Sequence, residues 1–390
     1  MGKLWTLFMK NLKDKSVIIL AHVLTTVPAE DLKEYMNNNK VKRLLYIALP
    51  LFYKEGRPGP FYEEYQSGVF VKKSSLPNGK LPGVIQYIRD FLLTVFWIIK
   101  QKKRWDIIIS LDNLNTASAL FLRSLGLIDK VIYYTIDFTP KRFANRLMNT
   151  VYHVIEKYAV LHADITWILT ERMAEGREKL FGISKKKQVV VPIGMWTKRI
   201  KILPYSKIEK HSIVYAGGLS PHQGIQLVLD AMPQVVKKIP DVKFKIIGIG
   251  LYEETLKKKT KELRLEKHVD FLGYQEKHEN VETILSSCGL AVAMYSEDLD
   301  IWSYYADPSK IKSYMATGLP VITTMVTYIA EQLEEKKCGV IVSYAKDKLA
   351  SAIIDMFSHP EKQKLYRKNA LNFAKQFDWE NVFSKGLSYV

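Results

Sequence analysis

The stretch Asp307-Pro308-Ser309-Lys310-Ile311-Lys312-Ser313-Tyr314-Met315-Ala316-Thr317-Gly318-Leu319-Pro320-Val321-Ile322 decides the fold of this chain. Pro308 suits the first position of a helix, because its ring presets φ and it has no amide proton to leave unpaired. Gly318 and Pro320 end the helix, and the β-branched run from Val321 to Thr324 predicts a buried strand. The stretch therefore predicts a helix and a strand of an α/β domain.

The first turn of this predicted helix contains Ser309 and Lys310. Backbone N–H groups at a helix start lack intrahelical partners, and the positive end of the helix dipole attracts anions. Because the dipole disfavours a lysine there, Lys310 indicates a bound anion that reverses the local field. The alternatives are a solvated surface lysine and a serine that only caps the helix. We expect a site for a phosphate-sized anion here.

The composition restricts the class of protein and its partners. The 390 residues suffice for two domains, and 47% hydrophobic residues suffice for their cores. The net charge of +18, from 58 Lys and Arg against 40 Asp and Glu, favours an anionic partner. Nucleic acid is not expected, because the lysine runs at 185–187 and 257–259 have no aromatic stacking platform beside them.

The cysteines and the apolar runs bear on the compartment. Cys288 and Cys338 each lie in an apolar run, which is typical of thiols in a reduced compartment. Residues 1–15 lack the apolar core and cleavage site of a signal peptide, and the longest apolar run, Phe91 to Ile99, is about half the length of a membrane span. We expect a cytoplasmic protein, peripheral at the inner face of a membrane.

Residues 1–200 are predicted to form a first doubly wound domain with a parallel sheet. A helix with a broad apolar face is predicted over 84–102, and residues 54–82 read as an irregular loop with one short strand over 68–72. The other strands are predicted over 16–21, 43–49, 106–111, 131–136, 163–169 and 188–192.

A second series of strands and helices begins at Ser212, after a polar and basic segment over 196–211 that we interpret as a linker. It predicts a second doubly wound domain over 201–372. The aromatic-rich tail over 373–390 is expected, by analogy, to pack toward the first domain.

Glycines follow two strands of the second domain. Gly217 and Gly218 come after the strand SIVYA, and Gly248 follows FKII. Glycine lets the backbone approach a ligand closely, whereas the alternative is an ordinary tight turn. The ligand reading gains weight because ligands of open α/β sheets bind beyond the carboxyl ends of the strands.

Carboxylates follow two strands of the first domain. Asp112 and Asn113 come after DIIISL, and Asp137 comes after VIYYTI. These positions suit general-base catalysis by Asp112 and Asp137 and recognition of a substrate hydroxyl by Asn113. The alternative is helix capping, for which Asp and Asn are preferred. His22 also follows its strand and is predicted to face the same substrate, although a lone histidine is more often structural.

Together these features resemble the GT-B nucleotide-sugar glycosyltransferases of group 1, also called family four, over nearly the whole chain. The segment 308–322 is similar to their donor-site helix, Gly217-Gly218 to their phosphate-facing loop, and Phe271 to Tyr274 to their base-side strand end. The resemblance implies two Rossmann-like domains facing a cleft, with a C-terminal helix crossing back to the first domain. It implies these donor-binding residues: Gly217, Gly218, Gln223, Gly248, Tyr274, Ser309, Lys310 and Ser313.

The chain departs from the family at charged positions. Many relatives carry two glutamates, where this sequence has Tyr305 and Ser313, and an Arg and a Lys where it has Gly218 and Gln223. Acidic replacements could come from Glu297, Asp298, Asp300 or Asp307.

The resemblance implies transfer of a sugar from a nucleoside diphosphate sugar to a hydroxyl of a glycan or lipid-linked acceptor, with no metal and no cofactor. Two alternatives stay open, a GT-B nucleotide-sugar epimerase and a non-catalytic nucleotide-sugar-binding or membrane-surface subunit. Residues 1–13 and the helix over 84–102 also predict contact with an anionic membrane surface, since both combine apolar faces with lysines. Packing of these faces into the core is the alternative.

Overall fold

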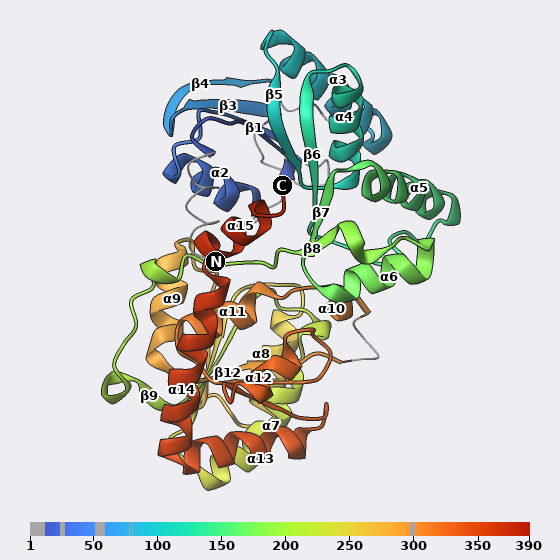
Figure 1. Cartoon of the computed structure of the whole chain (residues 1–390). Helices are drawn as coiled ribbons and strands as arrows, with labels where there is room; N and C mark the ends of the chain where they lie inside the picture. Colours follow the sequence, from blue (N-terminus) through green and yellow to red (C-terminus); the bar gives the residue numbers. More distant parts are fainter. Residues whose placement is uncertain (1–11, 24–27, 51–58, 78, 80, 297–300) are drawn as a thin grey trace. The chain divides into compact units, whose positions relative to one another are not determined.

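The computed structural model describes residues 12–23, 28–50, 59–77, 79, 81–296 and 301–390. The chain divides into two compact units, one formed by Met1–Pro192 with Trp379–Val390 and the other by Ile193–Asp378 (Figure 1). The expected domain limits at residues 200 and 372 differ from these divisions by a few residues. Residues 196–211, expected to be a linker, pack within the second unit, where Ile200 and Ile208 are buried.

The first unit is built on an eight-stranded sheet of order β4-β3-β2-β1-β5-β6-β7-β8. Strands β1, β2, β5, β6, β7 and β8 run parallel, while β3 pairs antiparallel with both β2 and β4. The bounds are β1 Ser16–Val23, β2 Arg43–Pro50, β3 Phe61–Gln66, β4 Val69–Ser75, β5 Trp105–Ser110, β6 Ile128–Thr135, β7 Ile165–Ile168 and β8 Gln188–Val190.

The hairpin of β3 and β4 corrects the expectation of an irregular loop with one short strand over 54–82. The sequence FYEEYQ of β3 contains two carboxylates, which obscure a strand pattern. In the structure both are neutralised across the hairpin, with Glu63 next to Lys73 at 3.0 Å and Glu64 next to Lys72 at 3.0 Å. Opposite charges on paired strands stabilise the pairing.

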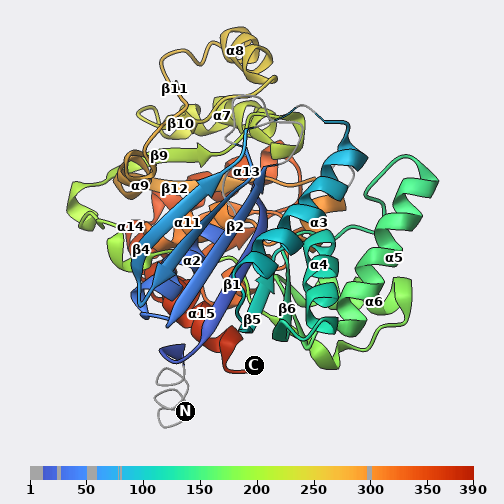
Figure 2. The ribbon, with the colours of Figure 1, turned by 90° about the horizontal axis from the view of Figure 1, so that it is seen from above.

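The helices of the first unit follow its strands. Helices α3, α4 and α5 pack in succession, α3 on α4 and α4 on α5, as Figure 2 shows. The bounds are α2 Pro28–Asn38, α3 Gly83–Lys100, α4 Asn113–Ser124, α5 Arg146–His162, α6 Glu171–Phe181 and α15 Trp379–Leu387.

The C-terminal helix α15 belongs to the first unit, which confirms the expected crossing of the chain back to its first domain. It packs on α2, where the rings of Phe383 and Tyr35 have their centroids 5.4 Å apart. Gly386 lets it approach the sheet, since an added Cβ would lie 2.9 Å from Val191 and 3.1 Å from Trp167. Phe373 and Phe377, expected in the same tail, instead belong to the core of the second unit.

The second unit has a six-stranded, all-parallel sheet of order β11-β10-β9-β12-β13-β14. Its strands are β9 Glu209–Ala216, β10 Lys243–Ile247, β11 Val269–Gly273, β12 Cys288–Ala293, β13 Val321–Thr323 and β14 Gly339–Ile341. Its helices are α7 Ile225–Lys238, α8 Glu253–Glu262, α9 His278–Ser287, α10 Ile301–Tyr305, α11 Ser309–Ala316, α12 Ala330–Glu335, α13 Lys346–Ser358 and α14 Pro360–Ala374.

Both faces of this second sheet are buried, which explains why its strands read as continuous apolar runs. Successive residues of β9 alternate between two cores. Ile213 and Tyr215 pack in the core that contains residues of α7 and α13, and Val214 packs in the core that contains residues of α11 and α14. The carboxyl ends of the strands are therefore the parts of the sheet that are available for a ligand.

Candidate functional site

The loop after β9 is shaped by glycines that no other residue could replace without strain. Gly217 has φ +151°, and a Cβ there would lie 2.9 Å from the Tyr215 hydroxyl and 3.4 Å from the Lys310 Nζ. Gly248, at the end of β10, has φ +127°, and a Cβ there would lie 1.9 Å from the Gly217 carbonyl oxygen. L residues with side chains rarely adopt such φ values. Gly248 thus supports the loop by making room for Gly217.

Helix α11 begins one residue later than expected. Pro308 takes the N-cap position with φ −69° and ψ 111°, so that Ser309 is the first helical residue and Lys310 the second. No side chain caps this helix, although Ser309 was expected as one alternative to do so. Ser309 is exposed at the helix start. The first amides of α11 are therefore not capped by a side chain, and the anion site at this helix start stays a prediction.

Lys310 reaches from α11 to the glycine loop. Its Nζ donates to the Tyr215 hydroxyl at 3.2 Å and to the Gln223 side-chain oxygen. The same ammonium lies 4.8 Å from the centroid of the Tyr215 ring and 5.6 Å from that of Tyr295. Four residues expected at the donor site, Gly217, Gly218, Gln223 and Lys310, are thus brought together.

Tyr215 organises this group, although the sequence analysis missed it. Its hydroxyl donates to the Gly218 carbonyl at 2.8 Å and lies 3.1 Å from the Gln223 side-chain oxygen. Burial raises the pKa of this hydroxyl well above its usual range, so it stays protonated and able to donate. Within the strand SIVYA a tyrosine reads as core, and only the glycines that follow it indicate a site.

A second tyrosine joins α11 to the same strand end. The Tyr314 hydroxyl accepts from the Ala216 N–H at 2.8 Å and donates to the Ala216 carbonyl at 3.2 Å. Tyr314 is fully buried, so this link holds the helix start against the glycine loop. The sequence shows this residue only as part of the helix pattern.

Two further expected donor residues lie apart from the contacts of Lys310. The Ser313 hydroxyl bonds to the Ser309 carbonyl at 3.2 Å, one turn back in α11. Tyr274 follows β11 and is 67% exposed, which leaves its ring available for stacking on a flat ligand group.

Asp307 is committed to a buried ion pair and is unavailable as a substitute for the missing glutamates. Its carboxylate accepts from the Ile193 N–H at 2.7 Å and pairs with Lys312, which also donates to the Ile193 carbonyl at 2.6 Å. Lys312 is 1% exposed, and burial lowers its pKa although Asp307 opposes the shift. The other candidates, Glu297, Asp298 and Asp300, lie outside the described residues.

Polar residues gather at the carboxyl ends of three adjacent strands of the first unit. His22 lies near the end of β1, Asp112 follows β5, and Asp137 follows β6. Because β1, β5 and β6 are neighbours and parallel, these three ends meet at one edge of the sheet. The sequence predicts this edge as the site of acceptor chemistry.

At this edge, Asp112 and His22 form an ion pair. The Asp112 Oδ2 lies 2.8 Å from the His22 Nδ1, and its Oδ1 accepts from the Asn115 N–H at 2.8 Å as the N-cap of α4. Burial acts to lower the pKa of His22, but Asp112 and Asp90 outweigh it and raise the pKa to about 10. His22 is therefore a cation at neutral pH. Burial acts to raise the pKa of the Asp112 carboxyl, but the neighbouring His22 outweighs burial and lowers that pKa.

These contacts change the roles that the sequence suggests for this edge. The imidazole of His22 is 8% exposed and lies between Asp112 and Asp90. Its two nitrogens therefore face these carboxylates, which favours a structural ion pair over direct contact with an acceptor. Asn113 is buried, and its amide donates to the Tyr152 carbonyl at 3.4 Å. Asp90 was not predicted to belong to this group, because it lies within an apolar helix far along the chain.

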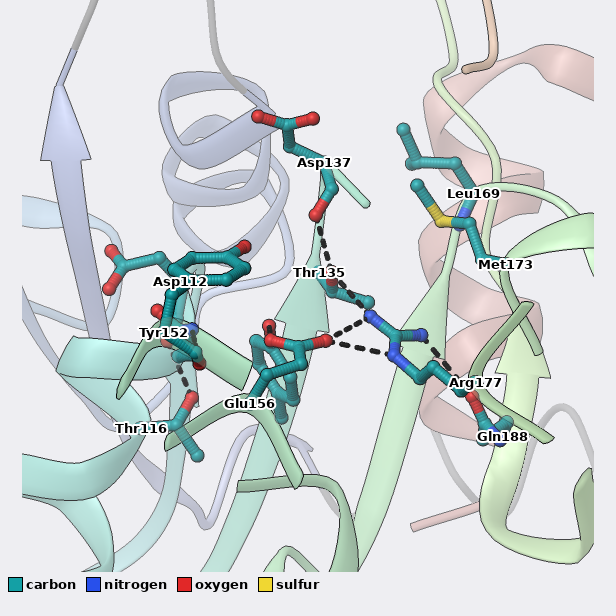
Figure 3. Close-up of polar contacts among 12 residues, drawn as sticks. Asp112, Thr116, Thr135, Asp137, Tyr152, Glu156, Leu169, Met173, Arg177 and Gln188 are labelled. Carbon is teal, nitrogen blue, oxygen red and sulfur yellow. Dashed lines mark hydrogen bonds and ion pairs between the residues drawn. The ribbon is translucent and has the colours of Figure 1, made fainter. Parts of the chain in front are cut away.

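Asp137 is the most accessible carboxylate of the three strand ends. Its side chain is 45% exposed and pairs with Arg142. Beneath it, the fully buried Arg177 donates to Glu156 at 2.8 Å and to the Thr135 hydroxyl at 2.9 Å. Figure 3 shows the Asp137 carboxylate directed away from this buried network. Thr135 also bonds to the Asp137 carbonyl at 3.3 Å, so the network anchors the backbone that presents Asp137.

Two further findings concern the part of the chain that the structure describes. No three His, Cys, Asp or Glu side chains there gather in a way that could hold a metal ion. None of the described helices is long and apolar enough to cross a membrane.

Comparisons with known proteins give this geometry a context. The family model of glycosyl transferases group 1 matches residues 204–373. Over 233 residues, 58% of this chain and 54% of the relative, the chain is 25% identical to the putative colanic acid biosynthesis glycosyltransferase WcaL of Escherichia coli K12. It is 28% identical to the alpha-monoglucosyldiacylglycerol synthase of Streptococcus pneumoniae over 40% of this chain and 35% of that protein. The chain thus spans about half the length of WcaL and less of the synthase.

Solved structures establish the fold. Anabaena HepE, crystallised with UDP, superposes with a TM-score of 0.72 at 15% identity, over 96% of this chain and all of that one. WaaG, a glycosyltransferase involved in lipopolysaccharide biosynthesis, gives a TM-score of 0.67 at 11% identity, over 96% and 99%. The expected GT-B fold is confirmed. Residues 204–373 thus belong to the group 1 glycosyltransferases, and they form the greater part of the second unit of a GT-B chain.

Proposed function

We propose that this chain transfers a glycosyl unit from a nucleoside diphosphate sugar to an acceptor hydroxyl in the synthesis of a polysaccharide, glycolipid or other cell-surface glycan. One observation carries the proposal: the Lys310 ammonium and the start of α11 converge on Gly217, where a side-chain atom would lie within 3.4 Å of Nζ. A diphosphate can accept hydrogen bonds from the lysine ammonium and from the amides at the helix start, and it fits against a backbone loop without side chains.

In the proposed reaction, the bond from the anomeric carbon to the diphosphate oxygen breaks, and a bond from that carbon to the acceptor oxygen forms. The negative charge that develops on the diphosphate is stabilised by Lys310 and the amides at the start of α11. Gly217 and Gly218 give the diphosphate room, Gly248 holds this loop in place, and Gln223 orients Lys310.

The remaining donor contacts are also part of the proposal. Ser309 and Ser313 lie on α11 one turn apart, where their hydroxyls suit a phosphate and a ribose hydroxyl. Tyr274 suits the base, because its exposed ring offers a stacking face.

On the acceptor side we propose Asp137 as the carboxylate that takes the proton from the acceptor hydroxyl, since it is exposed at a strand end. Asp112, whose two oxygens are occupied by His22 and Asn115, orders the neighbouring strand end with His22 and Asn113 around it.

We further propose that the chain acts in the cytoplasm, at the inner face of a membrane, on a glycan or lipid-linked acceptor. The names of similar proteins, which include a glucosyldiacylglycerol synthase and a phosphatidyl-myo-inositol mannosyltransferase, support such an acceptor.

The experiment is to incubate the purified chain with a panel of nucleoside diphosphate sugars, with and without acceptors extracted from membranes. Release of nucleoside diphosphate together with labelled acceptor supports transfer. A changed sugar with no nucleoside diphosphate released would instead show an epimerase. Binding of the nucleotide with no turnover under any condition would show a non-catalytic subunit, which the replacement of two glutamates by Tyr305 and Ser313 favours as the second candidate.

A further inference from the structure

Helix α3 exposes a stripe of large apolar side chains. Its outward stripe consists of Ile85, Ile88, Leu92, Phe96 and Ile99, which are 51%, 57%, 59%, 57% and 47% exposed. Surface helices of globular proteins normally direct such a stripe toward the core.

The inward stripe of α3 contains polar residues at the matching spacing. Gln86, Asp90 and Thr94 are 3%, 2% and 0% exposed. Gln86 donates to the Pro50 carbonyl at 2.6 Å, and Asp90 accepts from Arg89 at 2.7 Å and 2.9 Å. Between Gln86 and Thr94 the helix therefore buries polar groups, whereas Trp97 and Ile98 near its end are buried in the core. Five large apolar side chains remain outside, which favours an external apolar partner.

Helix α5 repeats the outward stripe. Leu147, Val151, Val154, Tyr158 and Leu161 follow one another by three or four residues and are between 47% and 73% exposed. Its buried positions include the charged Glu156, which belongs to the network under Asp137.

Helix α4 lies between α3 and α5 and connects the two stripes. It packs on both neighbours, and the rings of Phe121 on α4 and Phe91 on α3 have centroids 5.7 Å apart. Phe121 is itself 43% exposed. We call the outward stripes of α3 and α5, with Phe121 between them, the apolar face of the first unit. Figures 1 and 2 show the three helices that carry it.

The charges on these three described helices have one sign at the surface. Their only acidic residues, Asp90 and Glu156, are 2% and 0% exposed. Exposed basic residues occur on α3, just after it and on α5: Lys100, Lys102, Lys103, Arg104, Arg146 and Lys157. A second copy of the same face would bring like charges together, whereas an anionic lipid surface matches both the apolar stripes and the charge.

We infer that the apolar face of the first unit docks on an anionic lipid bilayer, with α3 and α5 lying in the interface plane. This inference deepens the proposed function, on which it rests for the nature of the acceptor, because docking would place the first unit beside lipid-linked hydroxyls. It keeps the expected membrane contact through the helix over 84–102 and extends it to α5. Of the expected segment over 1–13, residues 1–11 lie outside the described residues, and Leu12 is buried.

The test is flotation of the full chain with vesicles of phosphatidylcholine alone or of phosphatidylcholine and phosphatidylglycerol in equal parts, at low and high salt. We expect binding to the anionic vesicles that weakens with salt. The double variants Leu92→Gln/Phe96→Gln on α3 and Leu147→Gln/Val154→Gln on α5 should each lower the partition coefficient by at least about tenfold, because large apolar side chains leave the interface. Glutamine keeps the helices favourable.

The matched control is Leu365→Gln/Tyr389→Gln, which removes two exposed apolar side chains outside the apolar face, one 48% and the other 55% exposed, and should bind vesicles as the parent does. UDP binding without vesicles is measured on every variant, to separate a failed fold or a failed donor site from a failed docking surface. Equal recovery of the parent with neutral and anionic vesicles would overturn the inference. So would a parent dimer, seen by light scattering, that these substitutions dissociate with no vesicle binding. A parent that binds vesicles and no nucleotide would leave the docking surface standing and refute the proposed function.

Discussion

Replacing Lys310 by alanine is the sharpest test of the donor site. The substitution removes an ammonium that contacts the Tyr215 hydroxyl and Gln223 and lies beside Gly217. A hydrogen bond to a charged group contributes about 2 kcal/mol. At about 1.4 kcal/mol for each factor of ten, UDP should bind about 30-fold more weakly to Lys310→Ala.

The same substitution should change stability far less. Lys310 is partly exposed, and its contacts with Tyr215 and Gln223 are with neutral groups, so we expect the free energy of unfolding to fall by less than about 1 kcal/mol. Calorimetric titration with UDP measures the first effect, and urea denaturation followed by circular dichroism measures the second. The comparison of both effects separates loss of a ligand contact from loss of fold.

The matched control is Lys258→Ala, which removes an 80% exposed lysine from α8 and leaves the donor site untouched. It should bind UDP as tightly as the parent does, once the general loss of one positive charge is taken into account. If Lys310→Ala and Lys258→Ala bind UDP equally well, the reasoning that places a diphosphate at the start of α11 is refuted.

Three further outcomes are expected. Lys312→Met should lower the free energy of unfolding by at least about 3 kcal/mol in urea denaturation, because it leaves Asp307 charged and buried. The double variant Lys312→Met/Asp307→Asn should recover much of this loss. Equal losses in both variants would contradict the ion-pair argument. Asp137→Asn should reduce turnover strongly while UDP binding stays within a factor of two or so, since it alters only the acceptor side; full activity would return Asp137 to a structural role. Because the pKa of His22 is raised from 6.5 to about 10, its contribution to stability is complete below pH 6.5 and is lost as the pH rises toward about 10. The difference in unfolding free energy between the parent and His22→Gln should therefore shrink between these pH values. A difference that stays constant from pH 6 to 10 would rule out this ionised pair.

Much of the proposed donor site could be predicted from local patterns. Helix α11 with its glycine end, the strand after it and the glycines at 217 and 248 follow from backbone preferences that act within a few residues. What the sequence could not show was the part played by Tyr215 and Tyr314. Each reads as an apolar core residue, and its hydroxyl acquires a role only when α11 packs beside β9.

The acceptor side could be predicted less well, because capping and catalysis require the same residue types at the same place. Asp112 caps α4 and also pairs with His22, 90 residues away in the chain. Asp90 completes this pair from α3, where an apolar helix gave no reason to expect a functional carboxylate. Only the order of β1 and β5 in the sheet brings these three residues together.

By itself the sequence determined the alternation of strands and helices, the break into two α/β units and the anion-attracting start of α11, since these depend on periodicity and on backbone preferences close in the chain. Tertiary structure alone decided three other matters: which strand ends are neighbours, that Asp307 forms an ion pair with Lys312, and that the apolar stripe of α3 is exposed. The reason is physical. Periodicity shows which side chains share one face of an element, but the burial, charge and hydrogen bonds of that face depend on what other parts of the chain pack against it.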